Sequence, residues 1–384
     1  MLLGGLVLAG CAGELPRNLA CEAMAVEPDA LAQVATRAAQ ATEAQTVTGM
    51  AEVLTERQSQ RGARVDVLLL SSGGQWGAFS AGFLNGWSDN ETDPRPNRFE
   101  AVTGVSTGAL QAPFAFAGKA YDDTLRDLYY GVSEDQVLRR RGPLELLRAA
   151  SIWDPKPLER QVDRYLTRDL IDLIAAEASE RSLLVGAVNL QSGFFEAFDL
   201  TAMAASGAPE TPDCLAEGLL ASAAIPIAFP PRRIGDQLYV DGAARQGLFL
   251  RSLAKTDLRP TIYVLVNNAV SFPAEAPDFA LPSLVGRTQS IVTDELLRQS
   301  AIETVRFAEA QGWTVRGVVA PDIWPGLDCT NEDGEELAFC PSFTRALFDA
   351  GYTMAARGKI RWLGANALIA EMQRQARAEG RRIN

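Results

Sequence analysis

The sequence predicts an α/β protein with three layers, in which helices cover both faces of a mainly parallel central sheet. Short apolar segments alternate with longer segments of helical periodicity along most of the 384 residues. Residues 64–71 (RVDVLLLS) are typical of a buried strand, and a Gly-rich turn and a helical stretch at residues 78–87 follow them. Residues 99–103 and 106–118 repeat the pattern of strand and helix. Strands that alternate with helices in this way form parallel sheets.

The same alternation continues toward the C-terminal end. Further strands are predicted at residues 183–189, 194–198, 237–240, 261–266 and 315–320. Further helices are predicted at residues 31–58 (one or two), 123–150, 157–178, 215–223, 281–310 and 342–356. A hydrophobic content of 47% is ample for one large core. We expect a leader (residues 1–11), a helical extension (12–61), one catalytic domain (62–360) and a basic C-terminal helix (361–384).

The charge balance argues against a nucleic-acid partner. The chain has 36 Lys and Arg against 48 Asp and Glu, a formal net charge of −12, whereas binding to a phosphate backbone needs concentrated positive charge. One local exception is residues 357–382, which hold seven basic residues and only two acidic ones. This pattern favours a solvated C-terminal helix, and contact with anionic lipid is the competing interpretation.

The chain contains no histidine. A Ser-His-Asp triad, a Cys-His pair and a zinc site with histidine ligands are therefore impossible within it. Any nucleophile must be activated by a carboxylate, by an N-terminal amine or by a lysine, of which there are only four.

The first residues predict a lipid-anchored protein. Residues 1–10 are almost wholly apolar, too short to span a bilayer but suited to a signal peptide. They end in Leu8-Ala9-Gly10-Cys11, which resembles a bacterial lipobox, whose Cys is lipidated after cleavage. We therefore expect membrane anchoring through Cys11 in a bacterial cell envelope, facing the periplasm. The competing interpretation is a cytoplasmic protein with an apolar first strand.

Four further cysteines follow the leader, and no C-x-x-C pair is present. This absence argues against a zinc ribbon or a thiol redox motif. In an oxidising compartment, Cys329 and Cys340 are candidates for a disulfide because they flank a polar loop. Cys21 and Cys214 are left without an assigned pairing. No later segment has the roughly 18 uninterrupted apolar residues of a transmembrane helix.

A candidate nucleophile lies in Gly104-Val105-Ser106-Thr107-Gly108, between a predicted strand and a predicted helix. A sharp strand–turn–helix exposes the middle residue, and glycines two residues away on either side let the backbone turn without Cβ clashes. Ser106 would then stand at a helix N-terminus, where free N–H groups favour negative charge.

A Gly-rich segment, Ser72-Gly73-Gly74-Gln75-Trp76-Gly77, lies about 30 residues upstream, also between a strand and a helix. It is a candidate oxyanion hole, because glycines expose backbone N–H groups to an anion. A dinucleotide loop fits less well, because the spacing is not G-x-G-x-x-G and no Lys-Ser/Thr follows. A tight turn with glycines kept for packing alone is the remaining alternative.

The candidate base is Asp241, which follows a predicted strand in Asp241-Gly242-Ala243. Most Asp-Gly pairs are simple turns, but a close and partly desolvated carboxylate can accept a serine proton. The lysine alternative is Ser252-Leu253-Ala254-Lys255, an S-x-x-K match without a following Lys-Thr-Gly.

These motifs together resemble the patatin-like phospholipase family of Ser-Asp acyl hydrolases. The Gly-rich loop is similar to the family's oxyanion loop, and the pentad around Ser106 matches its nucleophile elbow. Residues 221–231 (ASAAIPIAFPP) are similar to the Ala-Ser-x-Ala-x-Pro-x-x-Phe-Pro block that precedes the catalytic Asp. Asp241-Gly242-Ala243 fits the Asp-Gly-Gly/Ala motif. The resemblance covers residues 65–245 clearly and 340–362 loosely.

The resemblance implies a patatin-like fold and hydrolysis of phospholipid, lysophospholipid or another acyl ester. Asp241 would accept the proton of Ser106, and backbone N–H groups of Gly73, Gly74 and Thr107 would hold the oxyanion. The residues expected to support the elbow and the loops are Ser72, Gly77, Gly104, Gly108 and Gly242. No metal or cofactor is implied, and residues 328–339 miss the spacing of a calcium loop.

Two departures from the family pattern concern the Gly-rich loop. Ser72 stands where the family usually has its first glycine, and Trp76 where it usually has Arg or Lys. Loss of the cation removes one stabiliser of negative charge. Two other functions stay open: a non-lipid esterase or thioesterase on the same scaffold, and a non-catalytic lipoprotein that retains the fold.

Overall fold

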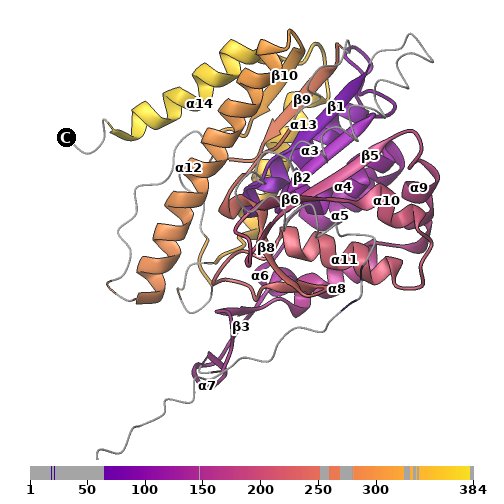
Figure 1. Cartoon of the computed structure of the whole chain (residues 1–384). Helices are drawn as coiled ribbons and strands as arrows, with labels where there is room; N and C mark the ends of the chain where they lie inside the picture. Colours follow the sequence, from indigo (N-terminus) through magenta and orange to yellow (C-terminus); the bar gives the residue numbers. More distant parts are fainter. Residues whose placement is uncertain are drawn as a thin grey trace, which may run out of the picture.

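The computed structural model describes residues 19, 21, 65–146, 148–250, 259–268, 279, 281–323, 329–331, 334 and 337–380. In this part of the chain an eight-stranded sheet is covered by helices on both faces (Figure 1). The predicted leader with Cys11 and the helices predicted at residues 31–58 lie outside the described residues.

Seven strands of the sheet follow one another in an order that differs from their order in the chain. They are β10 (Thr314–Val319), β9 (Thr261–Val266), β1 (Asp66–Leu70), β2 (Ala101–Val105), β5 (Ser182–Asn189), β8 (Gln237–Asp241) and β7 (Arg232–Ile234). The first five are parallel, β8 pairs antiparallel with the end of β5, and β7 pairs antiparallel with β8. The eighth strand, β6 (Phe195–Asp199), also pairs antiparallel with β5. The predicted mainly parallel sheet is confirmed.

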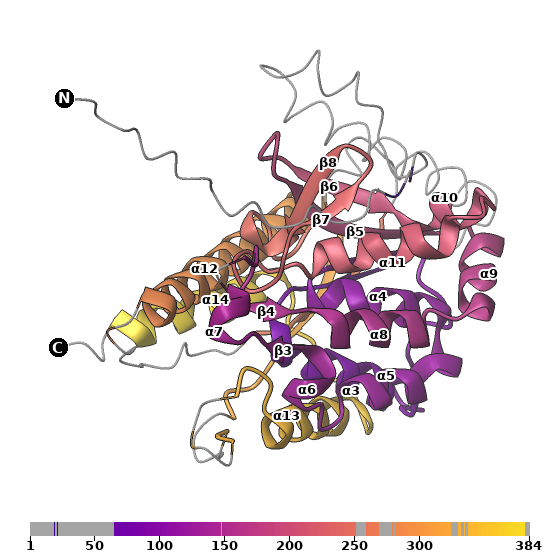
Figure 2. The same ribbon diagram turned by 90° about the horizontal axis from the view of Figure 1, so that it is seen from below.

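The two faces of the sheet carry separate apolar cores, because side chains alternate along each strand. In β1, Leu68 and Leu70 belong to one core, and Val67 and Leu69 belong to the other. The helices of the first core are α3 (Gly77–Ser88), α4 (Thr107–Ala117), α5 (Asp122–Tyr129), α8 (Lys156–Tyr165), α9 (Arg168–Ala176), α10 (Leu200–Ala205), α11 (Thr211–Ser222) and α13 (Pro341–Ala355). The second core lies under α12 (Leu281–Ala310) and α14 (Ala365–Gly380). Figure 2, the view from below, shows these layers edge-on. The predicted three-layer architecture is therefore confirmed.

The prediction of a single helix over residues 123–150 is wrong. The chain instead forms α5, α6 (Glu134–Val137), β3 (Arg139–Arg140) and α7 (Pro143–Leu146). Gly131 has a φ of 72°, which ends the helical path. Ser133 then starts α6 with a capping box that it shares with Gln136. Local turn and cap residues thus override the apolar periodicity of this segment.

The helix predicted at residues 157–178 is two helices, α8 (Lys156–Tyr165) and α9. The side chain of Thr167 caps α9 by accepting a hydrogen bond from the N–H of Leu170. The short strand β4 (Trp153–Asp154) pairs antiparallel with β3, and α10 and β7 were not predicted. The described residues also form three short 3₁₀ turns, η2 (Gly74–Trp76), η3 (Lys119–Tyr121) and η4 (Gly242–Ala244).

The described residues form two disulfides, one across 11 residues of sequence and one across 193. One is between Cys329 and Cys340, the candidate pair, and the other is between Cys21 and Cys214. The second ties Cys21 to α11, which packs beside β5 and β8.

In the described part of the chain, none of the helices has the length and apolar character needed to cross a membrane.

Candidate active site

Ser106 forms a strained turn between β2 and α4. Its φ of 56° and ψ of −123° lie outside the regions that L-residues usually adopt. The flanking glycines allow this turn, because a Cβ on Gly108 would lie 2.3 Å from the carbonyl oxygen of Leu70. A Cβ on Gly104 would lie 2.4 Å from the carbonyl oxygen of Gly108. The two predicted elbow glycines are thus required for the strand and the helix to meet at Ser106.

The elbow is held by Ser222, at the end of α11. Its Oγ accepts a hydrogen bond from the backbone N–H of Ser106 at 3.0 Å and donates one to the carbonyl of Gly186 on β5 at 2.6 Å. All three groups are buried. Ser222 lies in the Ala-Ser segment of residues 221–231, but no sequence pattern marked it individually as a site residue.

Strand register brings Asp241 beside Ser106. Val105, the last residue of β2, pairs with Gly186 on β5, so Ser106 follows at the level of Ala187. Ala187 pairs with Asp241, the last residue of β8. Because β6 occupies the opposite edge of β5 along residues 184–188, β8 lies on the same edge of β5 as β2, just beyond the end of β2. Gly242 lets the two strands approach, because a Cβ there would lie 2.5 Å from the carbonyl oxygen of Gly186. The two predicted dyad residues therefore stand next to each other at one level of the sheet, along the same edge of β5.

The Asp241 carboxylate is buried, and burial raises its pKa to about 7. Hydrogen bonding by the Ser106 side chain and by the N–H of Ala243 lowers that pKa, but by less than burial raises it. The Ala243 N–H donates to Oδ1 at 2.8 Å. Oδ2 has no hydrogen-bond partner of normal geometry among the described residues. The contact with Ser106 is thus a loose one, as is common for catalytic pairs without substrate.

The Gly-rich loop between β1 and α3 presents free backbone donors. Gly73 and Gly74 have φ values of 149° and 54°, which glycine adopts readily. The N–H groups of Gly73, Gly74 and Thr107 donate no hydrogen bond to any described residue. Gly74 and Thr107 line the same cavity as Ser106, whereas Gly73 packs behind them. A Cβ on Gly73 would lie 1.8 Å from the carbonyl oxygen of Asn267.

Asn267, directly after β9, holds the Gly-rich loop from behind. Its side chain donates to the carbonyl of Ser71 at 3.0 Å and accepts from the N–H of Ser80 at 3.2 Å. Ser72 donates from its backbone N–H to the carbonyl of Gly247 at 2.7 Å. Among the described residues, positive φ outside glycine occurs only at Ser106 and Ile227. Ser72 therefore keeps an ordinary backbone, and the serine at this family glycine position introduces no strain.

Further polar contacts join the loop to α4. Gln111 donates from Nε2 to the carbonyl of Gly77 at 2.7 Å. A Cβ on Gly77 would lie 2.1 Å from the hydroxyl oxygen of Thr107, so the loop and α4 touch directly. The Tyr129 hydroxyl donates to the carbonyl of Thr107 at 3.0 Å, and burial raises the pKa of Tyr129 to about 12. Tyr129 therefore stays protonated as a donor that orients the first turn of α4.

Trp76 occupies the position of the family's cation, and it packs rather than facing the cavity. Its ring meets that of Phe343 on α13 edge to face, with centroids 4.7 Å apart. The neighbouring Gln75 lines the cavity and accepts a hydrogen bond from the N–H of Cys340 at 3.0 Å. The Cys329–Cys340 disulfide is thus one hydrogen bond away from the Gly-rich loop.

A largely apolar cavity opens at Ser106 and extends along α4. From Ser106 to Phe114 the helix advances about 12 Å, and both residues line the cavity. Its apolar walls come mainly from α4, α5, α8 and α11 and from the segments that follow α11 and precede α13. They include Leu110, Pro113, Phe114, Leu128, Val137, Leu158, Val162, Leu219, Ile225, Phe229 and Phe339. Such a lining suits an apolar group bound next to Ser106.

Lys255, the S-x-x-K alternative base, lies outside the described residues. Within the described residues, no three His, Cys, Asp or Glu side chains cluster in a way that could hold a metal ion.

Comparison with known proteins identifies one family. Residues 68–254 match the model of the patatin-like phospholipase family. No curated protein matches the chain in sequence. The crystal structure of VipD from Legionella pneumophila is similar at 11% sequence identity and a TM-score of 0.35, covering 77% of this chain and 67% of that one. The matched residues include the end of β1, the Gly-rich loop, Ser106 and Asp241. The chain therefore carries a domain of the patatin-like phospholipase family over residues 68–254.

Proposed function

We propose that this protein is a serine acyl hydrolase that cleaves carboxylic esters of lipids, with Ser106 as nucleophile and Asp241 as base. The observation that carries the proposal is the juxtaposition of four features: the strained Ser106, the buried Asp241 at the same level of the sheet, the unpaired N–H groups of Gly74 and Thr107, and the apolar cavity. Each supplies one requirement of ester hydrolysis.

The acylation step uses Asp241 as the proton acceptor. As the Oγ of Ser106 bonds to the ester carbonyl carbon, its proton passes to Asp241, which burial makes basic enough to hold it. The carbonyl oxygen becomes an oxyanion, which the N–H groups of Gly74 and Thr107 stabilise, with Gly73 behind them. Each such donor contributes on the order of 3 kcal/mol to transition-state stability. The ester C–O bond then breaks, and the leaving alcohol takes the proton from Asp241.

The deacylation step reverses these roles. Water attacks the acyl carbon and gives a proton to Asp241. The bond to Ser106 Oγ then breaks, the serine recovers the proton, and a fatty acid leaves. No step requires a metal or cofactor.

The cavity lining supports an acyl chain as the group bound beside Ser106. Leu110 and Phe114 follow Ser106 on α4 by one and two turns, so a chain that leaves the ester carbon would run along that helix. Val162 and Leu219 contribute to the same lining from α8 and α11. Each methylene removed from water there adds about 0.8 kcal/mol of binding free energy. This supports a lipid ester over a short polar one.

Membrane attachment through lipidated Cys11, in an envelope facing the periplasm, is part of the same proposal. It rests on the Leu8-Ala9-Gly10-Cys11 pattern alone. Metabolic labelling with a radioactive fatty acid tests it: wild type incorporates label, and Cys11→Ala does not. Equal labelling of both proteins would overturn it.

A substrate series tests the catalytic proposal. Hydrolysis is measured for p-nitrophenyl esters of increasing chain length and for phospholipid in micelles, with wild type, Ser106→Ala and Asp241→Asn. We expect wild type to prefer longer chains and to release fatty acid from phospholipid, and both variants to lose activity by at least about a thousandfold. Full activity on short esters together with none on lipid would instead indicate a non-lipid esterase.

A further inference from the structure

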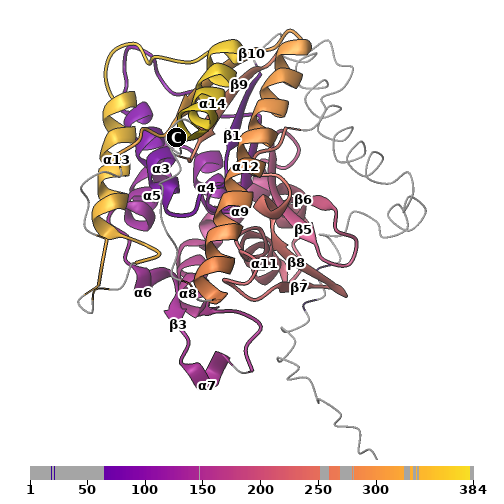
Figure 3. The same ribbon diagram turned by 90° about the vertical axis from the view of Figure 1, so that its left-hand side faces the viewer.

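A hairpin arm projects from the body of the protein next to the cavity. It runs from Arg139 to Asp154 and consists of β3, α7 and β4. Figures 1 and 3 show α7 at the lower end of the molecule, beyond the helices that flank the sheet. The arm leaves the body after α6 and returns to it at α8, and both of these helices contribute residues to the cavity lining.

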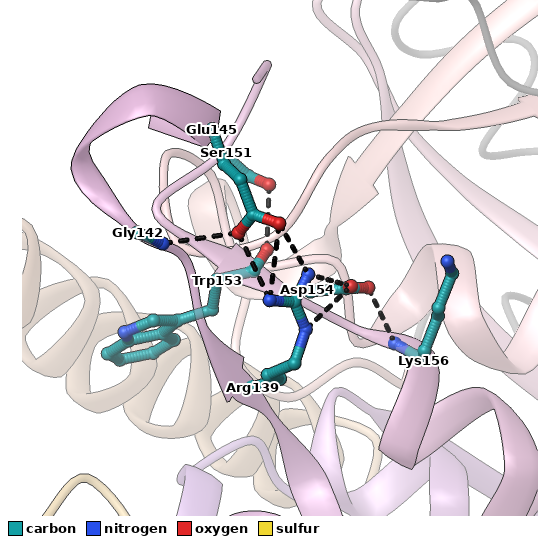
Figure 4. Close-up of polar contacts among 7 residues, drawn as sticks. All are labelled: Arg139, Gly142, Glu145, Ser151, Trp153, Asp154 and Lys156. Atoms are coloured by element: carbon teal, nitrogen blue, oxygen red, sulfur yellow. Dashed lines mark hydrogen bonds and ion pairs between the residues drawn. The ribbon is translucent and has the colours of Figure 1, made fainter. Parts of the chain in front are cut away.

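The arm is braced by a polar network at its base rather than being a loose loop. Figure 4 shows Arg139 between two carboxylates: Nη2 lies 2.8 Å from Oδ2 of Asp154, and Nη1 lies 3.0 Å from Oε2 of Glu145. Glu145 also accepts from the N–H of Gly142 at 3.1 Å. Asp154 is buried, so its bond to Arg139 is less screened than a surface pair. The network holds β3, α7 and β4 together.

The base of the arm is also attached to the rim of the cavity. The N–H groups of Ile152 and Trp153 donate to the carbonyls of Ile227 and Ala228, each at 2.9 Å. The ring of Trp153 packs edge to face on Phe229, with centroids 5.9 Å apart. Phe229 lines the cavity. The position of the arm is thus coupled to the wall of the proposed acyl site.

The arm exposes large apolar side chains that its own fold does not cover. Leu144 is 82% exposed and Leu146 is 43% exposed, both on α7. At the base, Ile227 is 47% exposed. A leucine left this open gains nothing from the protein core, and neighbouring exposed apolar residues are typical of a surface that contacts a partner.

The arm and its base are also rich in basic residues. Between residues 139 and 156 the chain has five basic residues, Arg139, Arg140, Arg141, Arg148 and Lys156. It has two acidic ones there, Glu145 and Asp154, and both are engaged with Arg139. Arg140 also pairs with Glu134, just before the arm. With Glu134 counted, the local charge of about +2 still contrasts with the net charge of −12 for the whole chain. A positive rim around an apolar tip is complementary to an anionic lipid surface.

We propose that the hairpin arm of residues 139–154 is an interfacial docking element. Leu144 and Leu146 would insert among the lipids of an anionic bilayer, with Arg148 and Lys156 at its headgroups. The proposal rests on the proposed lipid hydrolase function, because docking there would bring the cavity mouth against the substrate surface. The arm is a positioning element and does not take part in the chemistry.

Vesicle binding tests the proposal separately from catalysis. Co-sedimentation is measured in the Ser106→Ala background, so that no lipid is hydrolysed, with vesicles of phosphatidylcholine alone and of phosphatidylcholine with phosphatidylglycerol. We expect binding to the anionic vesicles, and Leu144→Asp/Leu146→Asp should weaken it by about tenfold or more. Arg148→Glu/Lys156→Glu should weaken binding to the anionic vesicles by about tenfold without affecting neutral ones.

Met354→Asp is the matched control. Met354 is also exposed, but it lies near the far end of α13, about 20 Å along the helix from its start beside the cavity. This variant should bind vesicles like its parent. With Ser106 restored, Leu144→Asp/Leu146→Asp should hydrolyse a soluble short-chain ester at the wild-type rate and vesicle lipid at least about tenfold more slowly.

Vesicle binding by Leu144→Asp/Leu146→Asp that equals the parent's would overturn the docking role. Slower hydrolysis of the soluble ester, with the fold intact by circular dichroism, would also overturn it, because the arm would then act on the site itself. Arm-dependent vesicle binding by a protein that hydrolyses no ester would leave the docking role standing and would instead remove the proposed catalytic function.

Discussion

Ser222 Oγ lies 3.0 Å from the backbone nitrogen of Ser106 and accepts its hydrogen bond. The same hydroxyl donates to Gly186 on β5, so one side chain joins α11 and the central sheet to the elbow. Positive φ at a non-glycine residue costs on the order of 1–3 kcal/mol. We infer that this bond helps to keep Ser106 in its strained conformation, because Ser106 N–H has no helical acceptor at the start of α4.

Replacing Ser222 with Ala should therefore impair catalysis without removing a reacting group. The buried N–H of Ser106 would lose its acceptor, at a cost of about 1–3 kcal/mol. We expect kcat for a soluble ester to fall by about tenfold while KM stays near the wild-type value. Steady-state kinetics checks this, with Ser192→Ala, in an exposed turn, as the control. An unchanged kcat would show that the elbow keeps its geometry without Ser222.

The pH dependence of activity should follow the ionisation of Asp241. Its pKa is raised to about 7 by burial, and only the deprotonated carboxylate can accept the Ser106 proton. The value of kcat/KM should therefore rise with pH and reach half its maximum near pH 7. A rate profile with a soluble ester measures this. A profile that is already flat from pH 5 upward would mean that the base has an ordinary carboxylate pKa.

The same burial should make the folded protein less stable when the Asp241 carboxylate is ionised. Because its pKa in the folded protein lies above the unfolded value, its contribution to stability is complete below about pH 4 and is lost as the pH rises through about 7. Asp241→Asn does not titrate, so its stability relative to wild type should increase between pH 5 and pH 8. The increase should be on the order of a few kcal/mol.

Urea unfolding of wild type and Asp241→Asn at the two pH values checks this difference. The Asp169→Asn variant, altered on the exposed side of α9, controls for general effects of removing a carboxylate. If the stability difference between wild type and Asp241→Asn is the same at both pH values, Asp241 does not titrate in this range.

Cavity length can be tested at Leu110, one helical turn beyond Ser106 on α4. Leu110→Trp would replace the leucine side chain with a larger indole ring, which would lie across the proposed path of the acyl chain. We expect kcat/KM for long-chain esters to fall by about tenfold or more and that for a butyrate ester to change little. The ratio of the two rates in one protein preparation corrects for differences in active fraction. A parallel loss for both chain lengths would place the acyl chain elsewhere.

Much of the fold could be predicted because its strands are short, apolar and buried. The strand predicted at residues 261–266 and the helix predicted at 281–310 have the bounds of β9 and α12. The segment after α5 could not be predicted in the same way. Its leucines recur at helical spacing, but Leu144 and Leu146 turn out to be exposed on an arm rather than buried in a helix. Apolar periodicity shows which residues share one face of an element, but it does not show whether another part of the protein covers that face.

The candidate site shows the same limit. The positions of glycines in the sequence predicted the elbow at Ser106 and the loop at Gly73 and Gly74, because both turns depend on glycines within a few residues. Ser222 and Asn267 act across 116 and 187 residues of sequence, on Ser106 and Ser80. A local sequence pattern cannot predict contacts between residues so far apart in the chain. For Asn267, the one sequence feature that could have indicated a role at the site is its position as a polar residue directly after a buried strand.

Labelling with a fluorophosphonate probe tests most directly whether Ser106 is an activated nucleophile. The probe reacts covalently with serine hydroxyls that have both a base and an oxyanion hole, and peptide mass spectrometry locates the adduct. We predict one adduct, on the peptide that contains Ser106, much slower labelling of Asp241→Asn, and none of Ser106→Ala. An adduct that persists in Ser106→Ala, or a wild-type protein that does not react at all, would contradict the assignment.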